Sequence, residues 1–417
     1  MQQHCLILGG GLSGKAAERL AASLGFSTAI LSDSPGLDAD AAVAEADLTV
    51  TSPGMKPLVS PLWQAAMRRA GKGQCKFISE LEFGFRNWPG KLLAITGTNG
   101  KTTTTELTAA LLTAAGVEAR TAGNIGLPLS ELAADLREGK LSPDALPVVE
   151  VSSFQLERCD TFAPFAAALL NLESDHVDRY AGGFAEYAAV KQRIFDRVAP
   201  ENRVYGLSMD SPVPRRVTLY GDALMIDEEE VLIDLGNTAL SAVHNRENLA
   251  AAVELCLRVL PLETVLSPEF RLAIHMFQPG RHRQELVCEK NGVRYVNDSK
   301  ATNPASTVAA LRAIPGTVVL LLGGLDKEMD FSPLAPFADR IRFAVLYGEC
   351  RAKIAAALPE SIPTADCGME FERAIRTACD HAQPGDTVLL APACASMDMF
   401  RDYKERGDRF AAFVKQL

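Results

Sequence analysis

The chain has 417 residues, of which 47% are apolar and 23% charged, a balance typical of a globular protein, and its length predicts two to four domains. A net charge of −10 argues against a general nucleic-acid binder, and no apolar run reaches the ~20 residues of a membrane helix. Nine scattered cysteines without a CxxC pair, and an N-terminus without a secretory pattern, indicate reduced thiols in a cytoplasmic protein rather than a zinc site.

Residues 1–88 are predicted to form the first α/β domain. Apolar runs at 5–8, 28–31 and 48–51 favour strands, and residues 15–24 favour a helix. The turn at 9–14 reads GGGLSG, the GxGxxG pattern of dinucleotide-binding folds, and Asp33 lies about twenty residues further on. In isolation this pattern predicts a ligand that carries a pyrophosphate, and the NAD of a dehydrogenase is one such ligand.

Residues 89–280 are predicted to form a second α/β domain that binds ATP. A strand at 91–96 runs into Gly97-Thr98-Asn99-Gly100-Lys101-Thr102, and a helix follows. Glycines in such a loop let backbone N–H groups point at phosphate oxygens, the Lys reaches the β- and γ-phosphates, and the Thr hydroxyl ligates Mg²⁺. The alternative is a Gly-rich turn that only caps a helix.

Three further residues of this region bear on a metal. Glu150 lies in the apolar run 148–151, where a nucleotide-binding sheet holds Mg²⁺, although an edge-strand Glu facing water fits the same pattern. His176 lies among three carboxylates in 171–180, a pattern that suits a ligand or a solvated loop equally. Lys191, on an expected helix, is unremarkable on its residue pattern alone.

Residues 281–417 are predicted to form a third domain, with strands at 318–322, 343–346 and 387–390 separated by helical stretches. Strand–helix alternation at this spacing predicts a parallel sheet covered by helices. The sequence as a whole therefore predicts an α/β protein of three domains, Rossmann-like, P-loop NTPase-like and again Rossmann-like.

Several motifs, taken in chain order, resemble those of the Mur ligases of peptidoglycan synthesis, and the resemblance spans essentially the whole chain. They are the phosphate loop at 97–102, Gly123-Asn124-Ile125-Gly126, the run 150–156, Asp175-His176-Val177-Asp178 and His244-Asn245. Residues 297–303 (NDSKATN) and 392–396 (PACAS) are similar to those of the D-glutamate-adding members of the family.

The resemblance implies a ligase reaction in the cytoplasm. ATP phosphorylates the carboxylate of UDP-N-acetylmuramoyl-L-alanine, and the amine of D-glutamate attacks the acyl phosphate to form an amide. Phosphorylation is needed because a carboxylate oxygen is a poor leaving group, and cations must hold the two anions together. The resemblance further implies a monomer and a third domain that closes on ATP bound at a domain seam.

The family's functional residues carry over to positions in this chain. ATP would be held by Gly97, Thr98, Asn99, Gly100, Lys101, Thr102, Thr103, Asn245, Asn248, Arg283 and Asp298. Two Mg²⁺ ions would be held by Thr102, Glu150, His176 and Lys191, the lysine being carbamylated by CO₂. Lys101, Lys191, His176 and Glu150 would thus be catalytic. The UDP-linked substrate would contact Leu12, Ser13, Asp33, Ser52, Asn124, Ser152 and Gln155. D-Glutamate would contact Lys300, Thr302, Lys327, Ser396 and Tyr403.

The chain departs from the family pattern at three places. An arginine that often follows the first-domain aspartate is absent after Asp33, a phenylalanine near the D-glutamate site is Tyr403, and an acidic residue is shifted to Asp326. Three alternatives remain open at this point: another amide ligase of the family, a nucleotide-sensing protein without chemistry, and a dehydrogenase.

Overall fold

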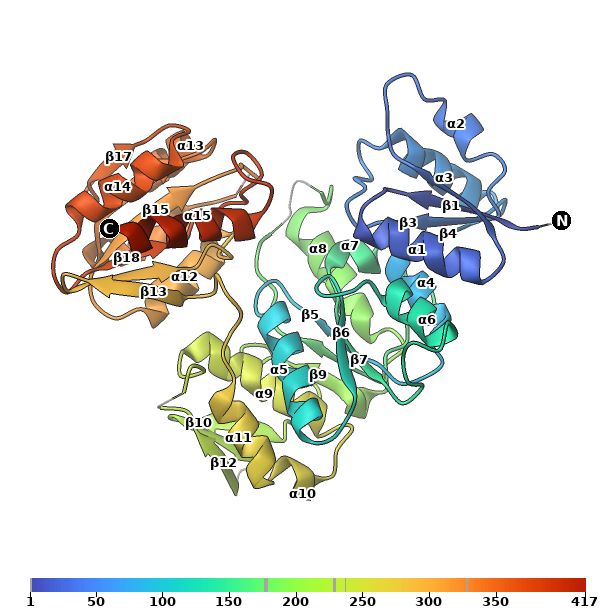
Figure 1. The fold of residues 1–417 in the computed structure, drawn as a ribbon, viewed down its shortest axis with the longest axis horizontal. Coiled ribbons are helices and arrows are strands. Elements are labelled where there is room, and N and C mark those ends of the chain that lie inside the picture. Colours follow the sequence, from blue (N-terminus) through green and yellow to red (C-terminus); the bar gives the residue numbers. More distant parts are fainter. Residues whose placement is uncertain (1, 176–178, 228–229, 237, 328) are drawn as a thin grey trace. The chain divides into compact units, whose positions relative to one another are not determined.

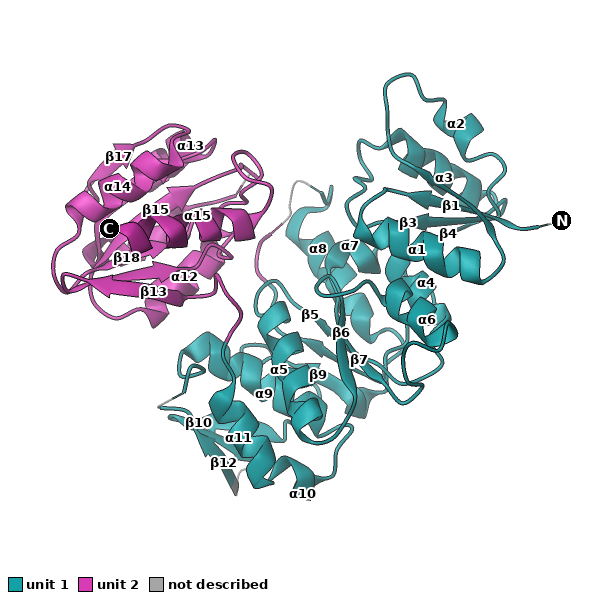
Figure 2. Ribbon diagram, in the orientation of Figure 1, with its two compact units in different colours: residues 1–172, 179–278 teal, residues 173–178, 279–417 magenta. Residues whose placement is uncertain are grey.

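The computed structural model describes residues 2–175, 179–227, 230–236, 238–327 and 329–417. The chain folds into two compact units (Figure 2). Unit 1 comprises residues 1–172 and 179–278, and unit 2 comprises residues 173–178 and 279–417. Within the described ranges, no helix is both long enough and apolar enough to cross a membrane.

Unit 1 begins with a four-stranded parallel sheet in the order β2-β1-β3-β4 (Figure 1). Its strands are β1 (His4–Leu8), β2 (Ser27–Leu31), β3 (Leu48–Thr51) and β4 (Lys76–Ser79). The helices of this part are α1 (Leu12–Ser23), α2 (Ala39–Ala42), α3 (Pro61–Gly71) and α4 (Glu80–Arg86). The three predicted strands and the predicted helix are confirmed, because apolar runs such as 5–8 are buried in the centre of the sheet.

The rest of unit 1 is built on a five-stranded parallel sheet in the order β6-β7-β5-β8-β9. The strands are β5 (Leu93–Thr96), β6 (Ala119–Gly123), β7 (Leu146–Glu150), β8 (Ala166–Leu169) and β9 (Arg203–Tyr205). The helices are α5 (Lys101–Ala114), α6 (Leu129–Arg137), α7 (Ser153–Leu156), α8 (Gly183–Gln192), η1 (Arg193–Phe195), η2 (Pro200–Asn202), α9 (Val243–Cys256), α10 (Leu262–Val265) and α11 (Pro268–Met276). A small antiparallel sheet of β10 (Val217–Tyr220), β11 (Ala223–Ile226) and β12 (Glu230–Asp234) lies before α9.

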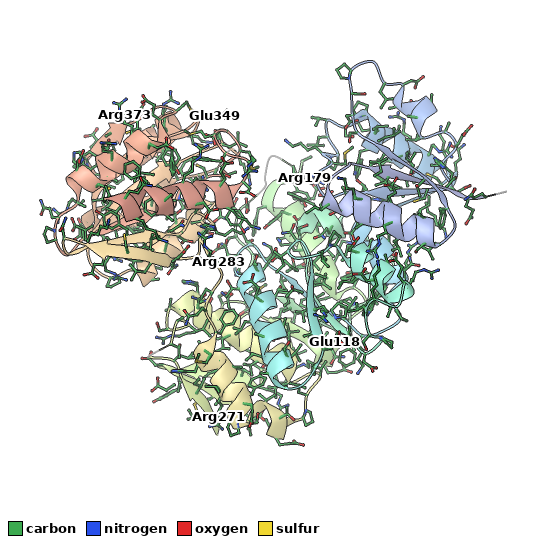
Figure 3. The ribbon with its side chains drawn as sticks, viewed as in Figure 1. Glu118, Arg179, Arg271, Arg283, Glu349 and Arg373 are labelled. Atoms are coloured by element: carbon green, nitrogen blue, oxygen red, sulfur yellow. The ribbon has the colours of Figure 1, made fainter. Side chains whose placement is uncertain are left out.

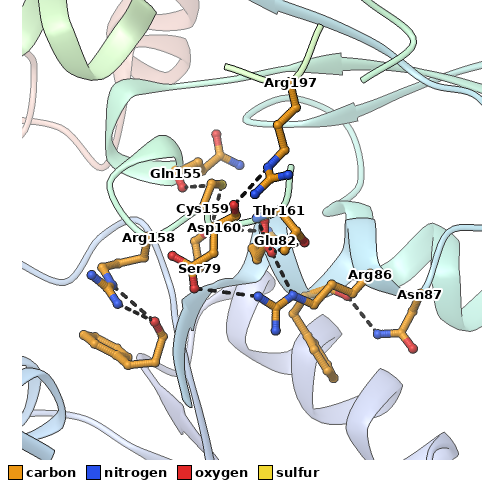
Figure 4. Close-up of polar contacts among 12 residues, drawn as sticks. Ser79, Glu82, Arg86, Asn87, Gln155, Arg158, Cys159, Asp160, Thr161 and Arg197 are labelled. Atoms are coloured by element: carbon orange, nitrogen blue, oxygen red, sulfur yellow. Dashed lines mark hydrogen bonds and ion pairs between the residues drawn. The ribbon is translucent and has the colours of Figure 1, made fainter. Parts of the chain in front are cut away.

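Polar contacts join the two sheets of unit 1 through α4. The Glu82 carboxylate accepts hydrogen bonds from the Thr161 backbone N–H at 2.9 Å and from Arg86 at 2.7 Å (Figure 4). Glu80 accepts a hydrogen bond from the backbone N–H of Ser130 on α6, at 2.8 Å. On α1, Arg19 forms ion pairs with three acidic residues on and just after α6. The expected boundary at 88/89 lies between α4 and β5, inside unit 1.

Unit 2 contains a six-stranded sheet in the order β13-β14-β18-β15-β16-β17, parallel except for β13. The strands are β13 (Glu285–Lys290), β14 (Val293–Asn297), β15 (Val318–Gly323), β16 (Ile341–Tyr347), β17 (Thr364–Asp366) and β18 (Thr387–Leu390). The helices are α12 (Pro304–Ala313), η3 (Ser332–Arg340), α13 (Arg351–Ala357), α14 (Phe371–His381) and α15 (Tyr403–Gln416). The three predicted strands of this domain are confirmed, and two apolar clusters cover the two faces of the sheet.

Candidate active site

The phosphate loop connects β5 to α5 with the backbone geometry that the sequence predicts. Gly97 and Gly100 have φ values of 155° and 81°, which side chains other than glycine rarely adopt. A Cβ at Gly100 would lie 2.1 Å from Oδ1 of Asn248 on α9, so a steric clash also excludes any larger residue at this position. Gly100 is the N-cap of α5 and makes no side-chain cap, which leaves the first N–H groups of the helix oriented for an anion.

Two lysines converge on this loop. Lys101 Nζ donates to the carbonyl oxygens of Gly97, at 2.9 Å, and Thr98, at 2.8 Å. Lys191 Nζ, from α8, donates to the same Gly97 oxygen at 2.8 Å, although the two residues are 94 positions apart in the chain. Lys191 is therefore not the unremarkable helix residue that its local pattern suggests.

Lys191 is held in a polar and aromatic setting although it is only 2% exposed. Its Nζ lies 4.9 Å from the centroid of the Tyr187 ring, and the Tyr187 hydroxyl is hydrogen-bonded to the Thr98 hydroxyl at 3.0 Å. Burying an ammonium group is costly unless strong partners compensate it, and such positions are often functional. Tyr187 is thus a residue of the site that sequence reasoning missed.

Glu150 lies at the C-terminal end of β7, between β6 and β5, and is 1% exposed. An edge strand facing water is therefore excluded for this residue. Its Oε1 accepts a hydrogen bond from Asn124 Nδ2 at 2.7 Å, whereas its buried Oε2 has no partner among the described residues. A buried carboxylate oxygen left open beside a phosphate loop suits a hard cation such as Mg²⁺.

The structure brings together three of the four predicted metal residues in unit 1. Thr102 lies in the first turn of α5 and is buried, with Glu150 on the neighbouring strand and Lys191 on the loop carbonyl. His176 lies outside the described residues. Among the residues that are described, no group of three or more His, Cys, Asp and Glu side chains is arranged to hold a metal.

Asn171 braces the phosphate loop from the end of β8. Its side-chain oxygen accepts from the Asn99 N–H at 2.8 Å, its side-chain N–H donates to the Asn99 carbonyl at 3.2 Å, and its own carbonyl accepts from the Thr98 N–H at 3.0 Å. The sequence pattern drew attention to the segment 171–180 because of His176 and assigned Asn171 no role. Its position at the carboxyl end of a parallel strand was the available signal.

The two asparagines predicted to hold ATP lie on α9, beside the first turns of α5. Asn248 Nδ2 donates to Asn245 Oδ1 at 3.4 Å, and the Thr104 hydroxyl donates to Asn248 Oδ1 at 3.3 Å. Both asparagines are buried, and burial also lowers the pKa of the neighbouring His244 to about 4. This end of α9 therefore presents amide groups and a neutral imidazole next to the phosphate loop.

Two of the residues predicted to contact the UDP-linked substrate form a capping box on α7. The Ser152 hydroxyl accepts from the Gln155 backbone N–H at 3.3 Å, and Gln155 Oε1 accepts from the Ser152 backbone N–H at 2.9 Å. A third, Asn124, is hydrogen-bonded to Glu150. Asn124 therefore contacts the carboxylate whose other oxygen is open, and Ser152 follows β7 two residues after Glu150, at the carboxyl end of the sheet.

The GxGxxG turn precedes α1, as predicted. Gly14 packs so tightly that a Cβ would lie 1.8 Å from the Gly9 carbonyl oxygen, and the Ser52 hydroxyl donates to that oxygen at 3.1 Å. The N-cap of α1 makes no side-chain hydrogen bond, Leu12 is 79% exposed, and Ser13 is half-buried. Asp33 accepts from the Leu62 N–H at the start of α3, at 3.2 Å. The turn is thus a bare helix N-terminus of the kind that binds phosphate.

Arg179, labelled in Figure 3, contacts two regions of unit 1 that are predicted to bind the UDP-linked substrate. Its guanidinium pairs with Glu157 through contacts of 2.6 and 2.7 Å, stacks 4.1 Å from the centroid of the Phe154 ring, and donates to the Met55 carbonyl at 2.9 Å. Met55 lies in the loop that begins at Ser52, and Phe154 lies in α7. Sequence reasoning did not single out this arginine.

In unit 2, the predicted nucleotide residues Arg283 and Asp298 influence one another. Burial raises the pKa of Asp298 to about 7, while the positive charge of Arg283 and a backbone N–H of Gln284 act in the opposite direction. His282 and Gln284, on either side of Arg283, have positive φ values of 66° and 48°. Strained backbone at two non-glycine residues is typical of a segment shaped for function.

The residues predicted for D-glutamate gather at the carboxyl ends of β14, β15 and β18 in unit 2. Lys300 and Thr302 follow β14, Lys327 follows β15, and Ser396 follows β18. Lys300 Nζ lies 4.2 Å from the centroid of the Tyr403 ring, so these two residues are brought together directly. The loops after β14, β15 and β18 are also joined by backbone hydrogen bonds, Ala393 to Ala301 and Leu325 to Ala395, each 2.9 Å.

Comparison with known proteins places these features in a family. Residues 95–223 match the Mur ligase middle domain, and residues 282–394 match the Mur ligase glutamate ligase domain. A protein of Aromatoleum aromaticum named UDP-N-acetylmuramoylalanine--D-glutamate ligase is 38% identical, over 100% of this chain and 97% of that protein. A protein of Frankia casuarinae with the same name is 38% identical, over 98% of this chain and 93% of that protein.

Solved structures share the fold at lower identity. A pseudomurein peptide ligase type C of Methanothermus fervidus and the UDP-N-acetylmuramate-alanine ligase MurC of Thermotoga maritima both have a TM-score of 0.62, at 16% and 14% identity and with full coverage of both chains. The folylpolyglutamate synthase of Mycobacterium tuberculosis has a TM-score of 0.55 at 14% identity, over 82% of this chain and 93% of that one. With near-full-length relatives at 38% identity and two matching domains, the chain belongs to the Mur ligase family.

Proposed function

We propose that the protein is an ATP-dependent ligase that joins D-glutamate to UDP-N-acetylmuramoyl-L-alanine, a step in the synthesis of peptidoglycan precursors. The observation that carries this proposal is the 38% identity, over the whole chain, to a protein named for that reaction. Unit 1 supports the ATP-dependent half through its phosphate loop and the buried Glu150. Unit 2 supports the amino-acid half through the lysines and hydroxyls at the ends of its strands.

In the proposed reaction, the substrate carboxylate attacks the γ-phosphorus of ATP, and the bond to the β,γ-bridging oxygen breaks to release ADP. The amine of D-glutamate then attacks the acyl phosphate, loses a proton, and expels phosphate as the amide forms. Backbone N–H groups of the loop and Lys101 would hold the phosphates through charge-assisted hydrogen bonds. To do so, Lys101 must exchange its two loop carbonyls for phosphate oxygens.

The residues in unit 1 fit Mg²⁺, because Glu150 has an open buried oxygen and Thr102 lies in the first turn after the loop. Bound there, Mg²⁺ would neutralise charge on the transferred phosphoryl group. We propose a second ion held by His176 and by Lys191 as a carbamate. Carbamylation joins the neutral Lys191 amine to CO₂ with loss of a proton, which turns a cationic side chain into an anionic one.

The UDP moiety is proposed to bind at the bare N-terminus of α1, near Ser13 and Ser52, so that the glycine turn serves UDP rather than NAD. Support comes from the exposed Leu12 and from the tight Gly9–Gly14 contact, which keep the helix end accessible. The protein is proposed to act as a monomer in the cytoplasm, where ATP is available. Sedimentation of the purified chain tests the monomer.

The direct test is a phosphate-release assay in which each component is omitted in turn. The proposal requires release only when ATP, Mg²⁺, UDP-N-acetylmuramoyl-L-alanine and D-glutamate are all present, with a product heavier by one glutamate residue. Release of phosphate without any amino acid at the same rate would mean that the protein is an ATPase of another kind. Oxidation of NADH in the presence of a candidate substrate would instead favour a dehydrogenase.

A further inference from the structure

Arg406, in α15 of unit 2, is the largest of the fully buried side chains that the structure describes, and it is 0% exposed. Removing a guanidinium from water is costly unless its N–H groups find acceptors. No ion pair joins Arg406 to a carboxylate among the described residues, and all the hydrogen bonds of its guanidinium end on uncharged oxygens. The charge of Arg406 is therefore solvated by backbone and hydroxyl dipoles.

The partners of Arg406 belong to three separate loops. Its Nε donates to the Ser299 hydroxyl at 3.0 Å and its Nη2 donates to the Ser299 carbonyl at 2.8 Å. Both Nη atoms donate to the Cys394 carbonyl at 3.1 Å, and longer contacts of 3.4 and 3.5 Å reach the carbonyls of Ala395 and Gly323. These acceptors lie at the carboxyl ends of β14, β18 and β15, so one side chain connects all three.

The same three loops carry the residues proposed to bind D-glutamate. Ser299 is adjacent to Lys300, and Ala395 is adjacent to Ser396. The Ser299 hydroxyl, which accepts from Arg406, donates in turn to the Tyr403 carbonyl at 2.8 Å, and the Tyr403 ring packs against Lys300. Arg406 thus sets the spacing of the loops and, through Ser299, the position of the aromatic residue that begins its own helix.

We propose that Arg406 is a positioning residue for the amino-acid site, and that its buried charge makes the site selective for an amino acid with two carboxylates. The proposal rests on the proposed function. The positive charge of Arg406, which forms no ion pair with a carboxylate in the described part of the chain, acts through a low-dielectric interior, where its field is less screened than in water. Glutamate offers two negative charges to that field, whereas glutamine offers one.

The test compares Arg406→Lys and Arg406→Met with Arg409→Met, whose side chain lies one turn along α15 and is 49% exposed. Steady-state KM values are measured for D-glutamate, ATP and UDP-N-acetylmuramoyl-L-alanine. Both Arg406 variants should raise the KM for D-glutamate by about tenfold or more and change the other two KM values by less than about threefold. Arg409→Met should leave all three unchanged. The preference for D-glutamate over D-glutamine should fall further in Arg406→Met than in the charge-retaining Arg406→Lys.

Ser299→Ala keeps the test decisive if the Arg406 variants do not fold. It removes the hydroxyl between Arg406 and Tyr403 without removing a charge, and it should raise the KM for D-glutamate selectively, by about threefold to tenfold. An unchanged KM for D-glutamate in folded variants, or an equal rise for all three substrates, would overturn the proposal. The wild-type protein in the same assay distinguishes failure of the proposed function from failure of the Arg406 proposal. An inactive wild type refutes the proposed function, whereas an active wild type with unaffected variants refutes only the role of Arg406.

Discussion

Lys191 and Lys101 both donate to the Gly97 carbonyl, and this shared acceptor explains why a lysine on α8 can act with the phosphate loop. As an ammonium, Lys191 adds positive charge close to the loop. As a carbamate, it would present two anionic oxygens in the same buried place. The difference in charge between the two states makes this residue the most informative one to substitute.

Lys191→Ala should lower turnover by at least about 100-fold, because metal ligands and their supports commonly carry effects of that size. An added short carboxylate such as formate should restore part of the activity by replacing the carbamate. Gln192→Ala, the exposed neighbour on the same turn, serves as the control. Full turnover in Lys191→Ala would contradict the assignment. If the wild type shows no ligase activity and Lys191→Ala binds the nucleotide as tightly as the wild type does, the results favour a nucleotide-sensing protein.

Glu150→Gln should raise the Mg²⁺ concentration needed for half-maximal activity by about tenfold or more, because it removes the charge from the open oxygen while Oε1 can still accept from Asn124. Titration of activity with Mg²⁺ measures this change. Glu118→Gln, which alters a partly exposed carboxylate just before β6, should behave as the wild type. Equal Mg²⁺ dependence in the two variants would remove Glu150 from the metal site.

At the scale of elements, α4 fastens the first sheet of unit 1 to the second through buried carboxylates. Burial raises the pKa of Glu80 to about 7, against the opposing hydrogen bonds from Ser130. A carboxyl group whose folded-state pKa is raised holds its proton longer in the folded protein than in the unfolded one. The stability that it contributes is therefore present at low pH and is lost as pH rises from about 4.5 to about 7.

Glu80→Gln should consequently melt at a higher temperature than the wild type at pH 8, by roughly 1–3 °C, and the difference should shrink as pH falls to 5. The glutamine oxygen can still accept from the Ser130 N–H, which limits the structural change. Calorimetry at several pH values measures the effect, with Glu45→Gln as an exposed control in the same domain. A difference that is independent of pH would show that Glu80 is charged throughout.

Arg179 acts between elements as well, since it connects α7 to the loop after β3. Arg179→Met keeps much of the side-chain volume but loses the Glu157 pair and the Met55 contact. We expect a rise of about tenfold in the KM for the UDP-linked substrate, with a small change in the KM for D-glutamate. Arg197→Met, on an exposed arginine, is the control. A change in the D-glutamate KM alone would contradict the position assigned to Arg179.

The sequence predicted elements whose signal is local. Central parallel strands such as β1, β3 and β15 appear as short apolar runs because both of their faces are buried, and the phosphate loop is indicated by its glycines. The parallel strands β6, β9 and β17 carry polar residues and are more exposed, so they give no such signal. The antiparallel strands β10–β12 escaped prediction because they are short and partly exposed, with Tyr220 80% exposed. The apolar neighbours of Glu150 favoured a buried strand end, but only the strand order excluded an edge strand. The burial of Lys191 could not be predicted from its neighbours, since it depends on the packing of α8.

Resemblance to a family predicted more of the site than local pattern could. It indicated Lys191, Lys300 and Tyr403, whose roles depend on contacts between segments far apart in the chain. It did not indicate Asn171, Tyr187, Arg179 or Arg406, which hold other residues in place through contacts with backbone carbonyls, aromatic rings and side-chain amides. Such supporting residues become visible only when hydrogen bonds across the fold are known.

At the scale of the whole molecule, the residues proposed for one reaction are divided between two units. The phosphate loop, Glu150 and the UDP residues belong to unit 1, and Arg283, Asp298 and the D-glutamate residues belong to unit 2. The residues proposed for the amine substrate thus belong to unit 2 alone, whereas those proposed for ATP are shared between the two units. Substitutions at the D-glutamate residues of unit 2 should therefore affect the amino-acid dependence. Substitutions at Arg283 and Asp298 should affect the dependence on ATP, and those in unit 1 the dependence on ATP or the UDP-linked substrate.

The most direct test of the central claim is phosphate release by the wild-type protein with ATP, Mg²⁺, UDP-N-acetylmuramoyl-L-alanine and a panel of amino acids. We expect rapid release with D-glutamate and little with L-glutamate, D-glutamine, L-alanine or a diamino acid. Activity with a different member of the panel would assign another ligase of the family. Equal release with D- and L-glutamate, or none with D-glutamate, would contradict the proposed function.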